Sequence, residues 1–249
     1  MAQGQEKPQL RSESGPTLNE LERVVYGVLV PAMEAARINP ENFKHYDPET
    51  VKRNLEYTAK LVADNSKDNN PYKEHAELAE AIIWDQINSG AFMGTEAKSI
   101  VPSKYEDITK GVDSIVRFEK KTGVAHLALA IDVTESAVEV DRKIEAILGD
   151  LQAGKLTTLE YFESKSQHGI GYQGMLENIP KVVVASGRKS VRAVAERIAK
   201  LWNLSEKATT DPQSKAEIEK LKRAISKSQL KFKMLFEIRA QLIKYADYA

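Results

Sequence analysis

The spacing of apolar positions changes along this chain, and the changes separate helical segments at both ends from a β-rich middle. A helix is predicted to begin near Thr17, because Thr17-Leu18-Asn19-Glu20 matches a capping box and an apolar stripe with helical spacing follows it. Similar spacing predicts further helices over residues 49 to 63, 72 to 88, 136 to 151, 189 to 202 and 214 to 245.

Short apolar runs between these helices predict the strands. They cover residues 97 to 101, 111 to 118, 126 to 134, 157 to 162 and 179 to 185. A Lys-Lys-Thr-Gly turn joins the second run to the third, so these two strands are expected to form a hairpin. The segment from 167 to 174 contains three glycines and is predicted to be a flexible loop near the strand ends.

The order of these elements predicts an α/β protein with a central mixed sheet and helical additions at both ends. Residues 1 to 16 are polar and aperiodic, which is typical of a disordered tail. The expected division is then an N-terminal helical module over residues 17 to 71 and a core over residues 72 to 202. A polar linker and a basic C-terminal helix follow over residues 203 to 249.

Composition limits the classes of function. The 249 residues include 36 basic and 36 acidic side chains, so no overall field recruits nucleic acid and any basic surface must be local. The absence of cysteine excludes thiolate chemistry, and the four histidines show no paired zinc-ligand spacing. No apolar stretch is long enough to span a membrane and the polar start lacks a signal core, so a cytoplasmic protein without membrane contact is expected.

Two aspartates carry the most specific chemical signal. Asp113 stands near the start of one hairpin strand, and Asp132 stands near the end of the next. Such a hairpin can bring both carboxylates to one end of a sheet, where they repel unless a proton or a divalent cation lies between them. The alternative is that Asp132 merely caps the turn that follows its strand.

The helix over residues 72 to 88 supplies a third carboxylate. Glu80 shares one helical face with Ala79 and Ile83, and a carboxylate on a buried face is costly unless something pairs with it. Glu74 and Glu77 are on the same helix but group less clearly with the apolar face. Glu106 and Asp107 precede the hairpin closely enough to approach the same site, although loop capping is the favoured role for both.

A helix with Glu80, a strand with Asp113, a strand ending Asp132-Val133-Thr134 and a helix with Lys143 together resemble the core of the PD-(D/E)xK nuclease-like superfamily, which has the restriction-endonuclease-like fold. The resemblance covers residues 72 to 202. It implies that Asp113 and Asp132 hold Mg²⁺ or Mn²⁺ and that Glu80 completes or orients the metal shell.

The chain departs from the family pattern at one position. Thr134 stands where the superfamily has a lysine that positions or activates the attacking water, and the resemblance implies that Lys143 takes over this role. The other interpretation of Lys143 is an ordinary exposed helix lysine. Three hypotheses follow: a metal-dependent nuclease acting on DNA or RNA, a catalytically degenerate nuclease-fold protein that binds nucleic acid or serves in assembly, and a fold whose carboxylates are purely structural.

Basic segments favour nucleic acid as a partner, with DNA preferred over RNA. Arg188, Lys189 and Arg192 begin the helix after a strand and a glycine, where a phosphate could meet the helix N-terminus; a solvated basic helix start is the alternative. The segment lacks the glycine and lysine pattern of a nucleotide-binding loop. The C-terminal helix is rich in lysine and has an apolar side that includes Phe232. It could pack on the core, contact phosphates or pair with a second copy to form a homo-oligomer.

Overall fold

The structure is a computed structural model that describes residues 17–65, 70–118, 127–135, 137–164, 171–207 and 211–248. Its centre is a four-stranded sheet in the order β1 (Ala97–Ile100), β2 (Ser114–Phe118), β3 (Leu127–Thr134) and β6 (Lys181–Ala185). The first three strands pair antiparallel, and β6 pairs parallel to β3. The predicted α/β class with a mixed sheet is therefore confirmed.

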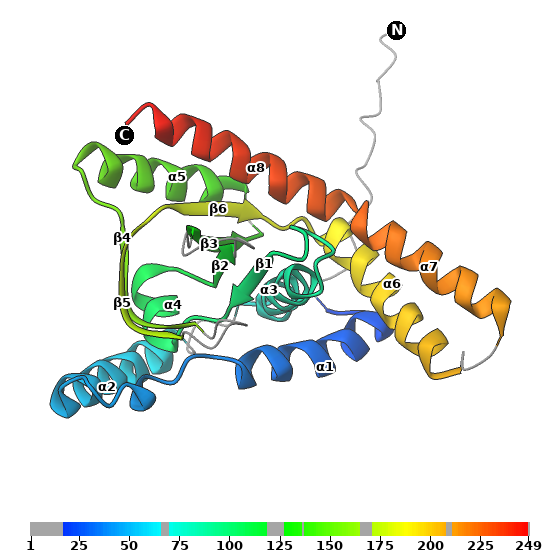
Figure 1. The fold of residues 1–249 in the computed structure, drawn as a ribbon, viewed down its shortest axis with the longest axis horizontal. Helices are drawn as coiled ribbons and strands as arrows, with labels where there is room; N and C mark the ends of the chain where they lie inside the picture. Colours follow the sequence, from blue (N-terminus) through cyan, green and yellow to red (C-terminus); the bar gives the residue numbers. More distant parts are fainter. Residues whose placement is uncertain are drawn as a thin grey trace, which may run out of the picture.

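The two faces of the sheet are covered differently. Helices α1 (Glu20–Ala35), α3 (Lys73–Asn88) and α6 (Arg188–Lys207) pack on one face, and the hairpin of β4 (Thr157–Ser164) and β5 (Tyr172–Ile179) packs on the other (Figure 1). Ile131 and Val184 belong to the larger core on the helical side, whereas Ile115 and Ala130 pack with Leu159 of the hairpin. Alternate residues of each strand thus face two separate apolar clusters.

Parallel pairing of β3 and β6 requires a crossover connection, because a tight turn cannot join parallel strands. The crossover contains helix α5 (Ala137–Gln152) and then β4 and β5. The strand predicted over residues 179 to 185 is β6, but it begins two residues later than expected, because Ile179 ends β5 and Pro180 separates the two strands. Residues 172 to 174 of the predicted flexible loop belong to β5, and residues 165 to 170 lie outside the described residues.

Two features of the helices differ from the sequence prediction. The capping box of α1 uses Asn19 and Glu22, so the helix begins at Glu20 and the box is shifted from the predicted one at Thr17. A short helix α4 (Lys104–Lys110) begins after Ser103, whose hydroxyl accepts from the backbone of Glu106. It was not predicted, because seven residues give too little periodicity. The N-terminal region also contains η1 (Pro40–Asn42) and α2 (Pro48–Asn65).

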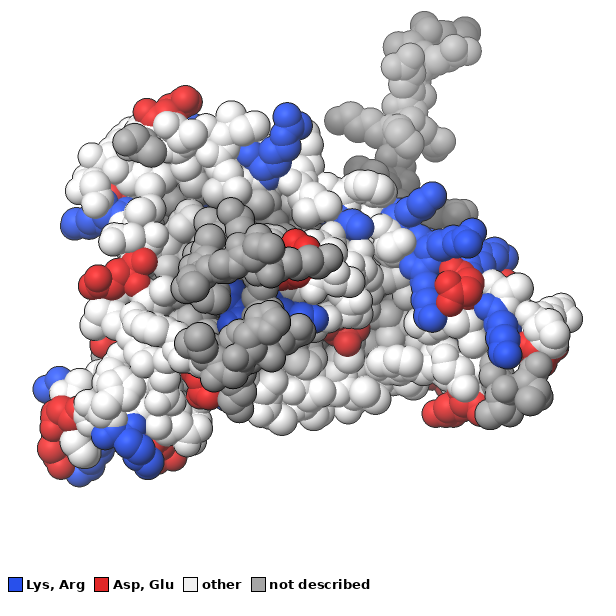
Figure 2. Space-filling view, in the orientation of Figure 1, with Lys and Arg blue, Asp and Glu red and all other residues white. Residues whose placement is uncertain are grey.

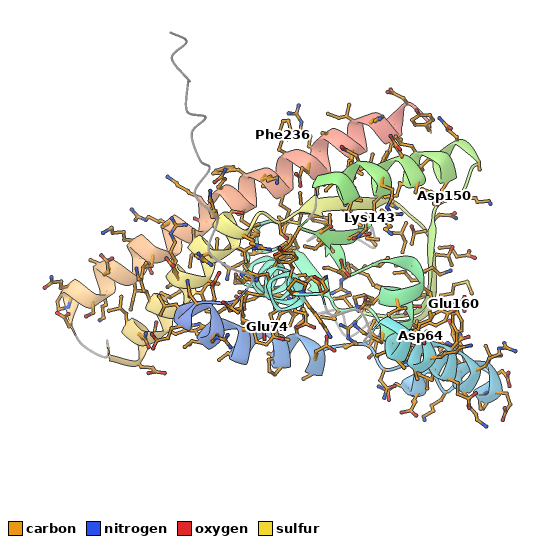
Figure 3. The ribbon with its side chains drawn as sticks, turned by 180° about the vertical axis from the view of Figure 1, so that it is seen from behind. Asp64, Glu74, Lys143, Asp150, Glu160 and Phe236 are labelled. Carbon is orange, nitrogen blue, oxygen red and sulfur yellow. The ribbon has the colours of Figure 1, made fainter. Side chains whose placement is uncertain are left out.

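The C-terminal segment is two helices, not the single helix that was predicted. Helix α7 (Pro212–Ser226) ends before Ser228, whose side chain caps the N-terminus of α8 (Gln229–Ala246). Figure 2 shows Lys and Arg side chains gathered at the end of the molecule where α7 lies, with acidic side chains among them. Phe232 and Phe236 of α8 are 57% and 69% exposed, and Phe236 points outward (Figure 3), so the predicted apolar side of this helix was wrong at Phe232.

Helix α8 closes the open edge of the sheet. Gln241 is buried and bonds the backbone of Val183 twice: it accepts from the N–H at 2.9 Å and donates to the carbonyl at 2.7 Å. Glu237 accepts from the N–H of Ala185 at 2.8 Å. An edge strand otherwise presents unpaired backbone groups to any passing chain, and here two side chains from α8 occupy them.

None of the helices in the described ranges is both long enough and apolar enough to cross a membrane. The predicted tail over residues 1 to 16 and the turn that joins β2 to β3 lie outside the described residues.

Replacing Gln241 by Ala should lower the free energy of unfolding by about 2 kcal/mol, because both backbone groups of Val183 lose their partner in a buried place. Urea unfolding followed by circular dichroism measures the change. Gln229→Ala is the matched control, since it makes the same substitution at an exposed position of the same helix. Equal unfolding free energies for the two variants would contradict the edge-closing role of α8.

Candidate active site

The β2–β3 hairpin positions the two aspartates as predicted from the sequence. Asp113 immediately precedes β2, and its N–H donates to the carbonyl of Ile131 at 2.9 Å. Its Oδ2 accepts from the N–H of Val133 at 2.6 Å, so the side chain reaches across to the end of β3. Because Val133 follows Asp132 directly, the hairpin register itself brings the two carboxylates together.

Asp132 is the most enclosed charge of the site. Its side chain is 3% exposed, and its Oδ1 is 2.6 Å from Nζ of Lys143 on α5. Its Oδ2 is 3.5 Å from Nζ of Lys181, the first residue of β6. Figure 3 shows Lys143 on the side of α5 that faces the sheet. The alternative of an exposed helix lysine is thus not what the structure has, because the side chain of Lys143 is directed at Asp132.

Lys181 is a site residue that the sequence analysis missed. It is adjacent to an apolar run and was counted within a strand, with no motif to single it out. Its Nζ also donates to the carbonyl of Lys110 at 2.6 Å, which fixes the ammonium group between the end of α4 and Asp132. A signal was available in the strand period: two residues before Val183, the partner of Asp132, Lys181 falls on the same face of the sheet.

Gly111 makes this close approach possible. It ends α4 in the left-handed conformation, with φ of 59°. A Cβ at this position would lie 3.2 Å from Nζ of Lys181 and 3.3 Å from Oδ2 of Asp132. A side chain here would therefore be strained in its backbone and would also crowd the ion pair.

Glu80 approaches the same region from α3. Burial raises the pKa of Glu80, the negative charges of Asp113 and Asp107 raise it further, and the positive charges of Lys104 and Arg37 lower it. Asp107 is itself paired with Lys104 at 2.7 Å and with Arg37 at 3.2 Å. Arg37, which follows α1, is a second residue that the sequence analysis missed, since a single arginine in a polar segment carries no signal.

The site therefore holds what we term the acidic cluster, four carboxylates from α3, α4 and the hairpin: Glu80, Asp107, Asp113 and Asp132. Burial is the largest cause that raises the pKa of Asp113 to about 7; the charges of Asp132 and Asp107 add to it, and the hydrogen bond from Val133 opposes them. Burial is also the largest cause of the raised pKa of Glu80, followed by the charge of Asp113. Two acids of the cluster thus compete for a proton or for another positive charge.

The other acidic candidates have structural roles. The carboxylate of Glu77 accepts from the hydroxyl of Tyr26, and Glu74 is exposed. Glu106 is buried and accepts from the N–H groups of Glu160 and Tyr161, both at 3.0 Å, at an irregular step in the β4–β5 pairing. Glu106 and Asp107 are both helix residues of α4. The loop-capping role predicted for both therefore differs in outcome: Glu106 does bind backbone N–H groups, whereas Asp107 pairs with Lys104 and Arg37 and approaches the acidic cluster.

The fit of a divalent cation depends on the aspartate pair. No group of three or more carboxylate or histidine side chains in the described ranges is arranged to hold a metal ion. Mg²⁺, however, is commonly bound through one or two carboxylates together with water and phosphate oxygens. The mutual repulsion that contributes to the raised pKa of Asp113 is what a cation between Asp113 and Asp132 would relieve, so this pair suits such an ion.

The three basic residues at the start of α6 are near the parallel ends of β3 and β6. Arg188 stacks on the ring of Tyr72, 4.0 Å from its centroid, and its Nε is 3.8 Å from Glu135. Arg192 pairs with the buried Glu22 at 3.1 Å. Lys189 is exposed. Arg188 and Arg192 therefore already stabilise the packing of α6 on its neighbours.

No protein-family model matches this chain, and neither the curated proteins nor the solved structures contain a significant match to it.

The raised pKa of Asp113 has a measurable effect on stability. An acid whose pKa is higher in the folded than in the unfolded protein destabilises the fold as pH rises from its unfolded value, near 4, to its folded value, about 7. Asp113→Asn removes this loss and keeps an oxygen for the Val133 N–H. The variant should therefore unfold with a free energy about 2 kcal/mol above the wild type at pH 8, after allowance for partial solvent exposure.

Denaturant unfolding between pH 5 and pH 8 tests this expectation, and the gap between variant and wild type should widen as pH rises. Asp141→Asn on the exposed side of α5 is the control, and its difference in unfolding free energy from the wild type should stay constant across this pH range. A gap that stays constant across this pH range would mean that Asp113 does not titrate there.

Proposed function

We propose that this chain is a divalent-metal-dependent nuclease-like protein that hydrolyses phosphodiester bonds of nucleic acid, with a restriction-endonuclease-like core. The observation that carries the proposal is the adjacent pair of Asp113 and Asp132, because Asp113 has a raised pKa and Asp132 is matched by two lysines. Perturbed acids of this kind gather at functional sites more often than elsewhere.

The topology supports the proposal. The helix with Glu80 precedes an antiparallel meander of β1, β2 and β3, and a crossover then returns to β6, which is parallel to β3. The resemblance to the PD-(D/E)xK superfamily rests on one part of this order, a helix, two strands and a helix, and it made no prediction about strand polarity. Glu80, Asp113, Asp132 and Lys143 come from the corresponding helix, strands and crossover helix.

Each residue of the site has a chemical role in this proposal. Asp113 and Asp132 would hold Mg²⁺ or Mn²⁺, with Glu80 supplying or orienting a further oxygen. When bound, such an ion offsets the charge of phosphate oxygens and lowers the pKa of a water molecule. Lys143 replaces the lysine that is absent at Thr134, and its ammonium group stabilises negative charge that develops on the phosphate.

A specific observation favours a second candidate function, a catalytically degenerate nuclease-fold protein that binds nucleic acid or serves in assembly. The Lys143 ammonium is 2.6 Å from Asp132 and Lys181 is 3.5 Å from it, so two cations already offset one of the carboxylates that would hold the metal. Thr134 adds to this case because a hydroxyl cannot replace an ammonium group. In this candidate the two lysines take the place of the ion.

The proposed partner in both cases is nucleic acid, with DNA preferred over RNA. Lys189 is the most exposed of the three basic residues at the start of α6 and is therefore the one that a phosphate would reach first. Pairing of two copies through the C-terminal helix remains a prediction; the outward side chains Phe232, Phe236 and Ile243 of α8 are the part of it that a second copy could reach.

The first experiment separates the two candidates. Isothermal titration with Mn²⁺ and cleavage of a labelled DNA duplex and single strand are measured for the wild type and for Asp113→Asn, Asp132→Asn and Lys143→Gln. A nuclease should bind the ion and cleave; both aspartate variants should lose binding, and the lysine variant should lose at least about a hundredfold in rate while keeping the ion.

Circular dichroism of each variant shows whether it is folded, and Asp141→Asn is the matched control on the same helix as Lys143. Ion binding without cleavage of any substrate favours the degenerate protein. An absence of ion binding in the folded wild type, with and without nucleic acid, would sink the metal-dependent proposal.

The second experiment addresses nucleic-acid contact at α6. Lys189→Gln should weaken DNA binding about equally for different sequences and reduce the slope of log affinity against log salt by about 1, because one phosphate contact is removed. Fluorescence anisotropy at several salt concentrations measures both quantities. Lys200 is exposed further along the same helix, and Lys200→Gln is the control. An unchanged salt slope for Lys189→Gln would place the DNA contact elsewhere.

A further inference from the structure

A cavity of about 490 Å³ lies beside the acidic cluster, on the side of Lys143 and Lys181. Helix α5, the end of α4 and the beginnings of β4 and β6 surround it. Five basic side chains and one acidic side chain line it: Lys110, Arg142, Lys143, Lys155, Lys181 and Asp150. Figure 3 shows Lys143 and Asp150 on the same helix, with Asp150 nearer its end that leads to β4.

The charge of this cavity is only partly offset. Lys143 and Lys181 are held by Asp132, and Arg142 pairs with Glu139 of its own helix. Lys110 and Lys155 are exposed and take part in no ion pair with another residue of the described ranges. A concave site with such an excess of positive charge attracts an anion, and ammonium groups form strong charge-assisted hydrogen bonds with phosphate oxygens.

Part of the cavity wall is apolar. Ile147 and Leu151 of α5 and Ile179 of β5 line it together with the basic residues. A bare phosphate ion would leave this wall without a contact, whereas a nucleotide has both an anionic group and a base whose flat faces can pack against apolar side chains. The volume lies within the usual range for sites that bind small organic ligands, which is about 300–1,000 Å³.

We propose that this cavity binds a nucleoside monophosphate unit, with its phosphate against Lys110, Lys155 and the Lys143–Lys181 pair. The bound phosphate draws Lys143 and Lys181 from Asp132. The binding itself is independent of catalysis, whereas its effect on a cation at Asp113 and Asp132 rests on the proposed function.

The coupling follows from the shared lysines. Without a ligand, the two ammonium groups offset the charge of Asp132. When a phosphate competes for them, Asp132 regains an uncompensated charge and its affinity for a cation increases. By thermodynamic reciprocity the cation must then raise the affinity for the nucleotide by the same factor.

The binding test uses thymidine 5′-monophosphate, titrated calorimetrically into the full chain in the presence of EDTA. Thymidine and inorganic phosphate are titrated in parallel. We expect the monophosphate to bind more tightly than phosphate by about tenfold or more and thymidine not to bind, since both the charge and the apolar wall are needed. Equal affinity for phosphate and the monophosphate, or no binding of the monophosphate at millimolar concentration, overturns the proposal.

Variants locate the site. Lys155→Gln and Lys110→Gln should each weaken binding roughly three- to tenfold, as expected for one charge-assisted contact. Lys200 is exposed on α6 and lies outside the cavity lining, so the control variant Lys200→Gln should bind the monophosphate as the wild type does. The same loss in all three variants would mean that the nucleotide senses only the overall charge of the protein, which also overturns the assignment.

A fourth variant tests the competition with Asp132. Asp132→Asn frees Lys143 and Lys181, so it should bind the monophosphate several-fold more tightly in EDTA, whereas a purely structural ion pair predicts unchanged or weaker binding. If this variant does not fold, the Lys155 and Lys110 variants still decide the proposal. Binding of the nucleotide without binding of Mn²⁺ would support the nucleotide site and overturn the proposed metal-dependent nuclease. Binding of Mn²⁺ without binding of the nucleotide would overturn the nucleotide site and leave the proposed nuclease standing.

Discussion

The parallel pairing of β6 with β3 determines where the charged groups of this protein meet. A parallel partner cannot follow through a tight turn, so the chain must cross over, and the crossover places α5 above the end of β3. Lys143 then faces Asp132, and Lys181 enters on the neighbouring strand. The same pairing leaves β6 at the edge of the sheet, and α8 is needed to satisfy its backbone through Gln241.

The parts of the fold that the sequence predicted are those with strong local patterns. The helix with Glu80 and the hairpin between Asp113 and Asp132 both carry enough periodic apolar positions to be recognised, and the hairpin register alone brings the aspartates together. Helix α4 and strand β5 were missed because the helix is short and the apolar residues of the strand do not alternate along it. Lys181 and Arg37 join the site through tertiary packing. The strand period places Lys181 on one face of its strand, but it does not show that this strand pairs with the strand of Asp132, and Arg37 has no spacing signal at all.

The electrostatics of the site are a balance between opposite charges. Asp107 is matched by Lys104 and Arg37, and Asp132 is matched by Lys143 and Lys181. Asp113 and Glu80 lie near these pairs, and burial together with neighbouring negative charge raises the pKa of both carboxyl groups. At this site, an active nuclease and a degenerate protein of the same fold would differ only in whether a metal ion displaces Lys143 and Lys181 from Asp132. Small changes in the positions of Lys143 and Lys181 would therefore favour one or the other of the two proposed functions.

Gly111 gives this balance a point of control that carries no charge. Its missing side chain lets Lys181 and Asp132 meet beside the end of α4, where a single methyl group would fall within 3.3 Å of both. The backbone of the preceding residue, Lys110, holds the same ammonium group. A drift in sequence at this one position could therefore retune the site electrostatically while every ionisable residue stayed in place, so relatives of this protein could differ in activity yet share an identical set of charged side chains.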